Sequence, residues 1–177
     1  VEIPCAKDGI TIFLHESNPV KELTLKQLSN IFAGRTKNWK EVGGPDAPIK
    51  LYGRENSSGT YVFFKDQVVK TDYAASCQTL PGTAAVVNAV SKDKFGIGYG
   101  GAAYASGVKH CAVKKDDKSA AYVADTETIK KGQYPITRYL YMYTRNRPTG
   151  DLKAYIDWIL SPEGQKLVAE VGYFPVK

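Results

Sequence analysis

The residues that could do chemistry lie together in segment 54–60, which reads Arg-Glu-Asn-Ser-Ser-Gly-Thr. Arg54 carries a full positive charge in a planar fork that matches two oxygens of one tetrahedral anion. Ser58 and Thr60 offer hydroxyl donors, and Gly59 lets the backbone approach an anion without a Cβ in the way. The segment therefore predicts a binding site for a tetrahedral oxyanion.

The elements around this segment would present backbone amides to such an anion. Residues 49–52 alternate as a strand, and residues 61–69 carry apolar side chains at the spacing of a buried helix. A loop between a strand and a helix exposes the first, unpartnered N–H groups of the helix and the positive end of its dipole. Ser57 and Ser58 can cap this helix and still donate their hydroxyls. The plainer alternative is that Ser-Ser-Gly is only a helix cap and Arg54 only a surface charge.

The rest of the chain alternates between strand and helix patterns. Residues 1–14 are rich in β-branched and apolar residues and predict a strand. Thr24 is a suitable N-cap for a short amphipathic helix that ends near Gly34. The remaining predicted elements are a buried helix over 82–90, strands over 95–99 and 139–144, and a C-terminal helix over 151–171 that Ser161 and Pro162 interrupt. The fold class is therefore α/β.

Two further motifs are assigned to structure rather than to a site. The glycine-rich segment 96–101 lacks the Lys-Ser/Thr of a nucleotide P-loop and the spacing of a dinucleotide-binding loop. It predicts tight backbone packing, with the lining of a ligand cleft as the alternative. The tyrosine-rich strand at 139–143 is interpreted as part of the core rather than as a binding platform.

Length and charge narrow the class of protein. A chain of 177 residues can bury one core, and the polar stretch 114–133 is its one plausible linker, without a clean domain boundary. Lys and Arg outnumber Asp and Glu by 24 to 18, a net charge of +6 that favours anionic ligands. The basic residues are scattered, so nucleic-acid binding is not expected. No apolar run approaches the roughly 20 residues of a membrane span.

The cysteines and histidines do not form a recognisable reactive site. Cys5, Cys77 and Cys111 are too far apart for a zinc knuckle or a redox pair, so no metal or cofactor is expected. Cys5 is interpreted as a small buried hydrophobe, and a disulfide between Cys77 and Cys111 stays undecided. His15 and His110 lie near no nucleophile in the sequence. We therefore expect no enzyme, and a phosphatase ranks third among the functions considered.

Ordered motifs along the whole chain carry a family resemblance. They lie at residues 3–10, 18–20, 23–24, 31–34, 38–39, 52–60, 63–64, 96–99 and 160–165. Together they resemble the PstS-like periplasmic phosphate-binding proteins, type II periplasmic binding proteins that serve ABC-type phosphate importers. The resemblance covers the later two thirds of the family's chain. It implies a periplasmic-binding-protein-like α/β lobe, with a mixed sheet flanked by helices and without the N-terminal segment of the first lobe.

The resemblance also implies site residues and an organisation. Arg54, Ser58, Gly59 and Thr60 are expected to bind inorganic phosphate, and Ser57 and Asp8 are additional candidates. Residues 8–115 would form the second lobe, and residues 116–177 the return strand and C-terminal helices. Because the chain begins at a valine without a signal-like segment, we expect a processed or trimmed product.

The function implied is phosphate binding for ABC-type uptake, with this chain contributing half of the site. The family's other half brings a carboxylate that accepts a proton from phosphate, and this carboxylate has no clear counterpart here; Glu55 is expected to pair with Arg54. The resemblance implies an ABC permease as partner, a second polypeptide that supplies the first lobe, and a periplasmic or extracellular location. The alternative is a non-enzymatic interaction or assembly module whose uncovered face recruits another protein.

Overall fold

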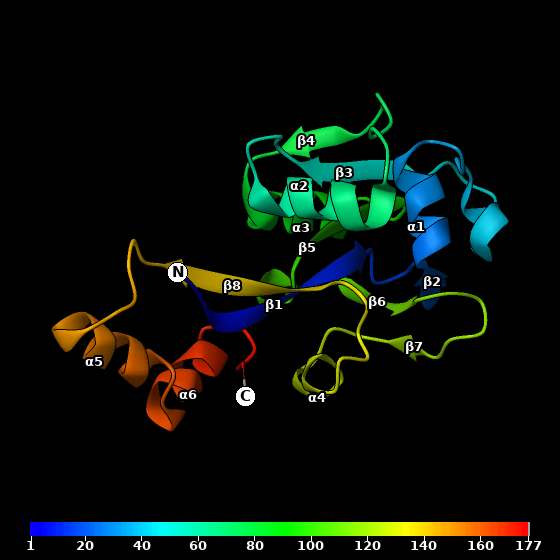
Figure 1. The fold of residues 1–177 in the computed structure, drawn as a ribbon. Coiled ribbons are helices and arrows are strands. Elements are labelled where there is room, and N and C mark those ends of the chain that lie inside the picture. The colour runs from blue at the N-terminus through cyan, green and yellow to red at the C-terminus, as the bar shows by residue number, and fades with distance from the viewer. Residues whose placement is uncertain (177) are drawn as a thin grey trace.

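The long first strand organises the molecule. The computed structural model describes residues 1–176 as a mixed α/β fold with one eight-stranded sheet, drawn in Figure 1. The strands are β1 (Glu2–Leu14), β2 (Glu22–Thr24), β3 (Lys50–Arg54), β4 (Gln78–Leu80), β5 (Gly96–Gly101), β6 (Lys109–Lys114), β7 (Ala121–Tyr122) and β8 (Thr137–Tyr143). The first half of β1 pairs with β8, and its second half pairs with β5 and β6. This strand therefore connects two parts of the sheet.

The helices surround the sheet at both of these parts. They are α1 (Leu25–Phe32), α2 (Gly59–Phe64), α3 (Gly82–Lys92), α4 (Thr126–Lys130), α5 (Gly150–Ile159) and α6 (Pro162–Glu170). Shorter turns are the 3-10 helices η1 (Trp39–Val42) and η3 (Ala102–Tyr104), and a π-helical segment η2 (Lys65–Val69) continues α2. Figure 1 shows α1, α2 and α3 gathered around β3 and β5, whereas α5 and α6 lie beside the β1–β8 ribbon. Within residues 1–176, none of the helices combines the length and apolar composition that crossing a bilayer requires.

Strand alternation places α2 and α3 on opposite faces of the sheet. The order β2-β6-β1-β5-β3-β4 puts β5 between β1 and β3, and β3 is parallel to both β4 and β5. The ring of Tyr99 stacks on Phe64 of α2 at 4.0 Å between centroids. Its neighbours Gly98 and Gly100 face α3 instead, because successive residues of a strand point to opposite faces. Helix α2 follows β3, and helix α3 follows β4. Because these two strands are parallel, their C-terminal ends lie at the same end of the sheet, and so do the N-termini of the two helices.

Helix ends follow the signals in the sequence. Thr24 forms a capping box with Gln27 at the start of α1, and Gly34 takes a left-handed φ of 73° just after its end. Ser161 caps α6 with Pro162 in its first turn, which separates this helix from α5. The predicted α/β class and the helix boundaries at these positions are confirmed.

Two structural expectations were wrong. The stretch 114–133 is not a plain linker, because it contains β7 and α4, and Ile129 of α4 is 2% exposed in the core. The tyrosines of β8 are not core residues: Tyr139, Tyr141 and Tyr143 are 46%, 41% and 71% exposed, because the face of the ribbon that bears them is uncovered.

The structure decides the open question of the disulfide and corrects the expectation that Cys5 is buried. All three thiols are free, so Cys77 and Cys111 form no disulfide. Cys111 is buried, whereas Cys5 is only half-buried, with its Sγ donating to the Leu140 carbonyl at 3.4 Å. Burial raises the pKa of Cys77 to about 11. Burial is also the largest cause that raises the pKa of Cys111, to about 12. Both thiols are therefore protonated and unreactive near neutral pH.

Candidate anion-binding site

The N-terminus of α2 is capped by Ser58. This residue has extended backbone angles, and its Oγ accepts hydrogen bonds from the amides of Thr60 at 3.2 Å and Tyr61 at 3.4 Å. The helix therefore begins at Gly59, two residues before the apolar pattern suggested, and Ser58 is buried. A serine cap of this kind satisfies two amides that have no partner within the helix. The amide-rich end of α2 is thus held in a fixed geometry at the end of β3.

Arg54 ends β3 and is fixed by two neighbours. Its Nε and Nη2 donate to the Glu55 carboxylate at 3.2 and 2.9 Å, and its Nη1 donates to Thr83 Oγ1 at 2.9 Å. The Arg54 side chain is only 14% exposed. Glu55 also accepts from the Gly82 amide at 3.2 Å. The guanidinium therefore lies at the start of α3, at the end of the strand that leads into α2, and is oriented before any anion arrives.

The Glu55 carboxylate joins Arg54 to the start of α3, because it accepts from both Arg54 and the Gly82 amide. The Arg54 hydrogen bonds, followed by the residue's own backbone N–H, lower the pKa of Glu55 to about 2. Glu55 is therefore ionised at neutral pH and keeps Arg54 in place. The expected pairing of Glu55 with Arg54 is confirmed. Its oxygens accept from Arg54 and from the Gly82 amide, so this carboxylate is engaged within the chain.

The glycines of β5 bring α3 close to the sheet. Every residue of β5 is buried. A Cβ on Gly100 would lie 2.2 Å from Thr83 Cγ2, and one on Gly98 would lie 2.6 Å from Val86 Cγ1. Neither contact is sterically allowed, so only glycine permits this approach. The predicted tight backbone packing is confirmed, and one consequence is that Thr83 reaches Arg54.

A second arginine contacts the start of α2 from the β1–β8 ribbon. Arg138 donates from Nε and Nη2 to Asp8 Oδ2 at 3.1 and 2.9 Å. Its Nη2 also donates to Thr60 Oγ1 at 2.9 Å, and its Nη1 donates to the Gly59 carbonyl at 3.1 Å. Asp8 is 4% exposed, and burial raises its pKa against the opposing effect of Arg138. Asp8 is therefore the counter-ion of Arg138.

Three hydroxyls at this site are left as donors. The hydroxyl oxygens of Ser58, Thr60 and Thr83 each accept N–H donors, from the backbone, from Arg138 and from Arg54 respectively. Within the described part of the chain, none of the three has an acceptor for its own hydrogen. A hydroxyl has one donor hydrogen, so each can point that hydrogen at an anion. The site consists of hydrogen-bond donors and one oriented guanidinium.

The predicted residues are partly brought together. Arg54, Ser58, Gly59 and Thr60 flank the start of α2, and Ser57 is an exposed loop residue next to the cap. Sequence reasoning missed Thr83 and Arg138, which come from α3 and β8. A usable signal for Arg138 was its position as the charged residue within the tyrosine strand, beside a strand that contains an acidic residue at position 8.

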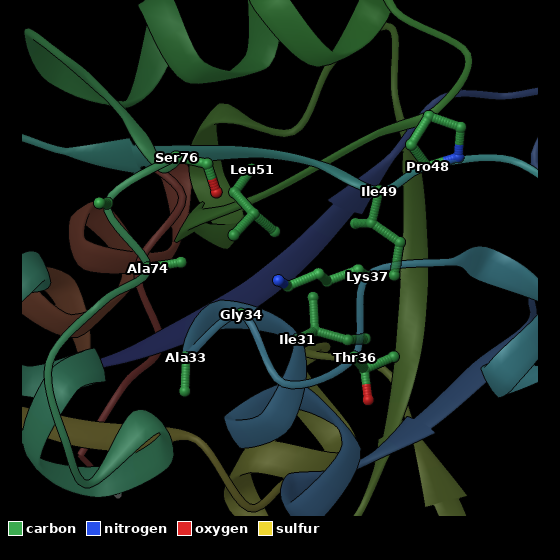
Figure 2. A pocket seen from close by; sticks show the side chains of 11 residues that line it. Ile31, Ala33, Gly34, Thr36, Lys37, Pro48, Ile49, Leu51, Ala74 and Ser76 are labelled. Carbon is green, nitrogen blue, oxygen red and sulfur yellow. The ribbon is translucent and has the colours of Figure 1, made fainter.

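A surface pocket lies apart from this site. It has a volume of about 510 Å³ and is lined by Ile31, Ala33, Gly34, Thr36, Lys37, Pro48, Ile49, Leu51, Ala74, Ala75 and Ser76. Figure 2 shows the Lys37 side chain reaching across the pocket and the Ser76 hydroxyl pointing into it from the opposite side. None of the candidate anion ligands lines this pocket, so it is separate from the loop.

Comparison with known proteins confirms the resemblance to periplasmic phosphate-binding proteins. Residues 1–163 match the family model described as PBP superfamily domain. The chain belongs to the PBP superfamily. The phosphate-binding protein PstS of Pseudomonas aeruginosa is 36% identical over 98% of this chain, and the PstS of Bacillus subtilis is 31% identical over 95% of it. The chain spans 59% and 55% of the lengths of these two relatives.

Solved PBP superfamily structures share the fold. A phosphate ABC transporter substrate-binding protein from Clostridium perfringens, solved with bound phosphate, has a TM-score of 0.86 and 34% identity. This chain is covered completely, and 72% of that protein is covered. An ABC-type phosphate transport receptor from Vibrio cholerae has a TM-score of 0.84 at 27% identity, with 98% and 72% of the two chains covered. The type II binding-protein fold class is confirmed.

Proposed function

We propose that this chain binds inorganic phosphate as part of a solute-binding protein for ABC-type uptake. The observation that carries the proposal is the guanidinium of Arg54, held by Glu55 and Thr83 at the end of the strand that leads into the capped start of α2. Tetrahedral oxyanions suit such a cradle of hydroxyls, amides and one fork-shaped cation. The relatives named for phosphate binding, and the related structure solved with phosphate, support the choice of phosphate. The proposed ligands are Arg54, Ser58, Gly59 and Thr60, with Ser57 as an additional one. Asp8, the second additional candidate, is proposed instead as the partner of Arg138.

We further propose that the chain supplies only half of a selective site. Its contacts to the anion are donors, and Glu55 and Asp8 are engaged by Arg54 and Arg138. Phosphate near neutral pH carries a proton that sulfate lacks, so selectivity needs an acceptor for that proton. In the proposal the acceptor comes from residues outside these 177 or from a second polypeptide. Residues 8–115 would act as one lobe, and residues 116–177 as the return strand and C-terminal helices.

Isothermal titration calorimetry of the 177-residue chain tests this proposal. We expect phosphate to bind with a dissociation constant that is roughly millimolar, because donors from one side only leave the anion half-solvated. Sulfate is expected to bind within about threefold of phosphate, since no acceptor distinguishes the two anions. Tight binding of phosphate together with strong rejection of sulfate would show that the chain holds a complete site.

The family also suggests where and with what the protein acts. We propose a periplasmic or extracellular location, an ABC permease as partner, and a transport role without catalysis. The support is the related structure named as a phosphate ABC transporter substrate-binding protein. A second support is that, among residues 1–176, the hydroxyls of Ser58, Thr60 and Thr83 donate to no base. The proposal assigns the chain no cofactor and no metal ion.

The second candidate function is protein interaction, favoured by the outer face of the β1–β8 ribbon. Tyr139, Tyr141 and Tyr143 line this face, with neighbouring ring centroids 6.0 and 6.1 Å apart. Within residues 1–176, β8 pairs with β1 alone, so its other edge has free backbone groups. An aromatic face beside a free strand edge is a surface for another polypeptide. The segment that completes the first lobe is the occupant that our first proposal implies.

Light scattering distinguishes this candidate from phosphate binding. If the ribbon serves assembly, the chain should self-associate at about 100 μM, and replacing Tyr141 and Tyr143 with serine should reduce that association. Phosphate and Arg54→Gln should leave it unchanged, because residues 54–60, the anion loop, lie outside β8. A chain that stays monomeric at this concentration contradicts an assembly function for the isolated protein.

A further inference from the structure

We infer that Arg138 is a positioning residue of the anion loop, which fixes the Thr60 hydroxyl as a donor toward the bound anion. The inference rests on the proposed function and adds a residue to it. Arg138 lies on β8, and its guanidinium reaches across to the first turn of α2. Its partners there are Thr60 Oγ1 and the carbonyl of Gly59, the first two residues of the helix.

In the hydrogen bond between Arg138 and Thr60, the arginine donates and the threonine hydroxyl accepts. A threonine hydroxyl can either donate its hydrogen to a neighbouring carbonyl or offer it to a ligand. The Arg138 Nη2 hydrogen occupies an acceptor position of Thr60 Oγ1 at 2.9 Å. The second bond, from Nη1 to the Gly59 carbonyl at 3.1 Å, engages an acceptor within the same turn. The Thr60 hydrogen is thereby left free for the anion, before the anion binds.

The guanidinium is itself held in place by Asp8 and by the ring of Phe63. Asp8 accepts two of its N–H groups through one carboxylate oxygen, Oδ2. The ring of Phe63, on α2, lies under the guanidinium with 5.3 Å from Cζ to the ring centroid. Asp8 and Arg138 are also register partners in the β1–β8 ladder. Arginine can satisfy these planar contacts at once, whereas lysine has only a compact ammonium.

The ion pair with Asp8 indicates that Arg138 positions Thr60 rather than attracting the anion by its charge. Because the buried Asp8 carboxylate lies 2.9 Å from Arg138 Nη2, the charges of the pair largely cancel at the distance of an anion. Arg138 would therefore act through the geometry of Thr60 and not mainly through its charge. Lys7, the neighbouring residue on β1, provides a matched loss of one positive charge, since its Nζ lies over the Tyr139 ring and not on α2.

A double-mutant cycle tests the inference with inorganic phosphate as the probe. Dissociation constants are measured from amide shifts during phosphate titrations of the full chain and of Arg138→Gln, Thr60→Val, the double variant and Lys7→Gln. We expect Arg138→Gln to weaken binding roughly tenfold when Thr60 is present and less than about twofold when it is valine. Arg138→Lys should be intermediate, and Lys7→Gln should change binding less than about twofold. Equal losses in both Thr60 backgrounds would overturn the inference.

A measurement without phosphate keeps the inference testable on its own. Hydrogen exchange of the Thr60 and Tyr61 amides, which donate to Ser58 Oγ, reports the order of the first turn of α2. We expect several-fold faster exchange in Arg138→Gln and unchanged exchange in Lys7→Gln, with the amides of α3 as internal reference. Unchanged exchange in Arg138→Gln contradicts positioning. If Arg54→Gln leaves phosphate binding intact, the proposed function fails, while this exchange result still decides the role of Arg138.

Discussion

Replacing Arg54 with glutamine is expected to lower the affinity for phosphate about 100-fold or more. The substitution removes the oriented guanidinium of the loop and also leaves the Glu55 carboxylate without its partner. An unpaired carboxylate beside the site repels an anion, so the two effects have the same sign.

Titration followed by amide shifts measures this loss even when binding is weak. Phosphate-dependent shifts of the Gly59 and Thr60 amides should disappear in Arg54→Gln at concentrations that saturate the unmodified chain. Arg35→Gln is the matched control, because Arg35 is exposed and, among residues 1–176, its guanidinium donates a hydrogen bond to Asn30 alone. It removes the same charge and should keep the affinity within about twofold. Equal losses in the two variants would mean that net charge, not the loop, attracts phosphate.

The anion loop was predictable because its parts are neighbours in sequence. Arg54, Ser58 and Thr60 lie in the single segment 54–60. Ser58 caps the helix that the apolar pattern of the following residues predicted. The contacts that orient these groups were not predictable, since Thr83 is 29 residues from Arg54 and Arg138 is 78 residues from Thr60. Local patterns do not specify which distant strand or helix will lie beside a loop.

The errors about the fold have related causes. An alternating aromatic strand shows that one face differs from the other, but burial depends on what covers that face, and the tyrosine face of β8 is uncovered. The polar stretch 114–133 contains α4. This helix has five residues, a capping box at Asp125 and one buried side chain, Ile129. A single apolar residue gives no helical period, so this helix could not be separated from a loop.

Gly100→Ala is expected to weaken both the fold and the site. The new Cβ would lie 2.2 Å from Thr83 Cγ2 and 3.0 Å from Phe13 Cε2, so the first turn of α3 must move away from β5. Forcing a methyl group into such packing typically costs about 1–3 kcal/mol. For a chain of this length that corresponds to a fall of roughly 2–12 °C in Tm, measurable by calorimetry. Displacing Thr83 also removes the Nη1 contact that orients Arg54, so phosphate affinity should fall roughly tenfold.

Gly98→Ala separates the two effects, because it makes a similar clash with the same helix. Its Cβ would meet Val86 Cγ1 at 2.6 Å and Val90 Cγ2 at 3.0 Å, one turn further from the start of α3. The fall in Tm should therefore be comparable, whereas Thr83 and its bond to Arg54 should stay in place. We expect phosphate affinity in Gly98→Ala within about threefold of the unmodified chain. Equal losses of affinity in the two variants would show that general loosening of α3, rather than the position of Thr83, controls the orientation of Arg54.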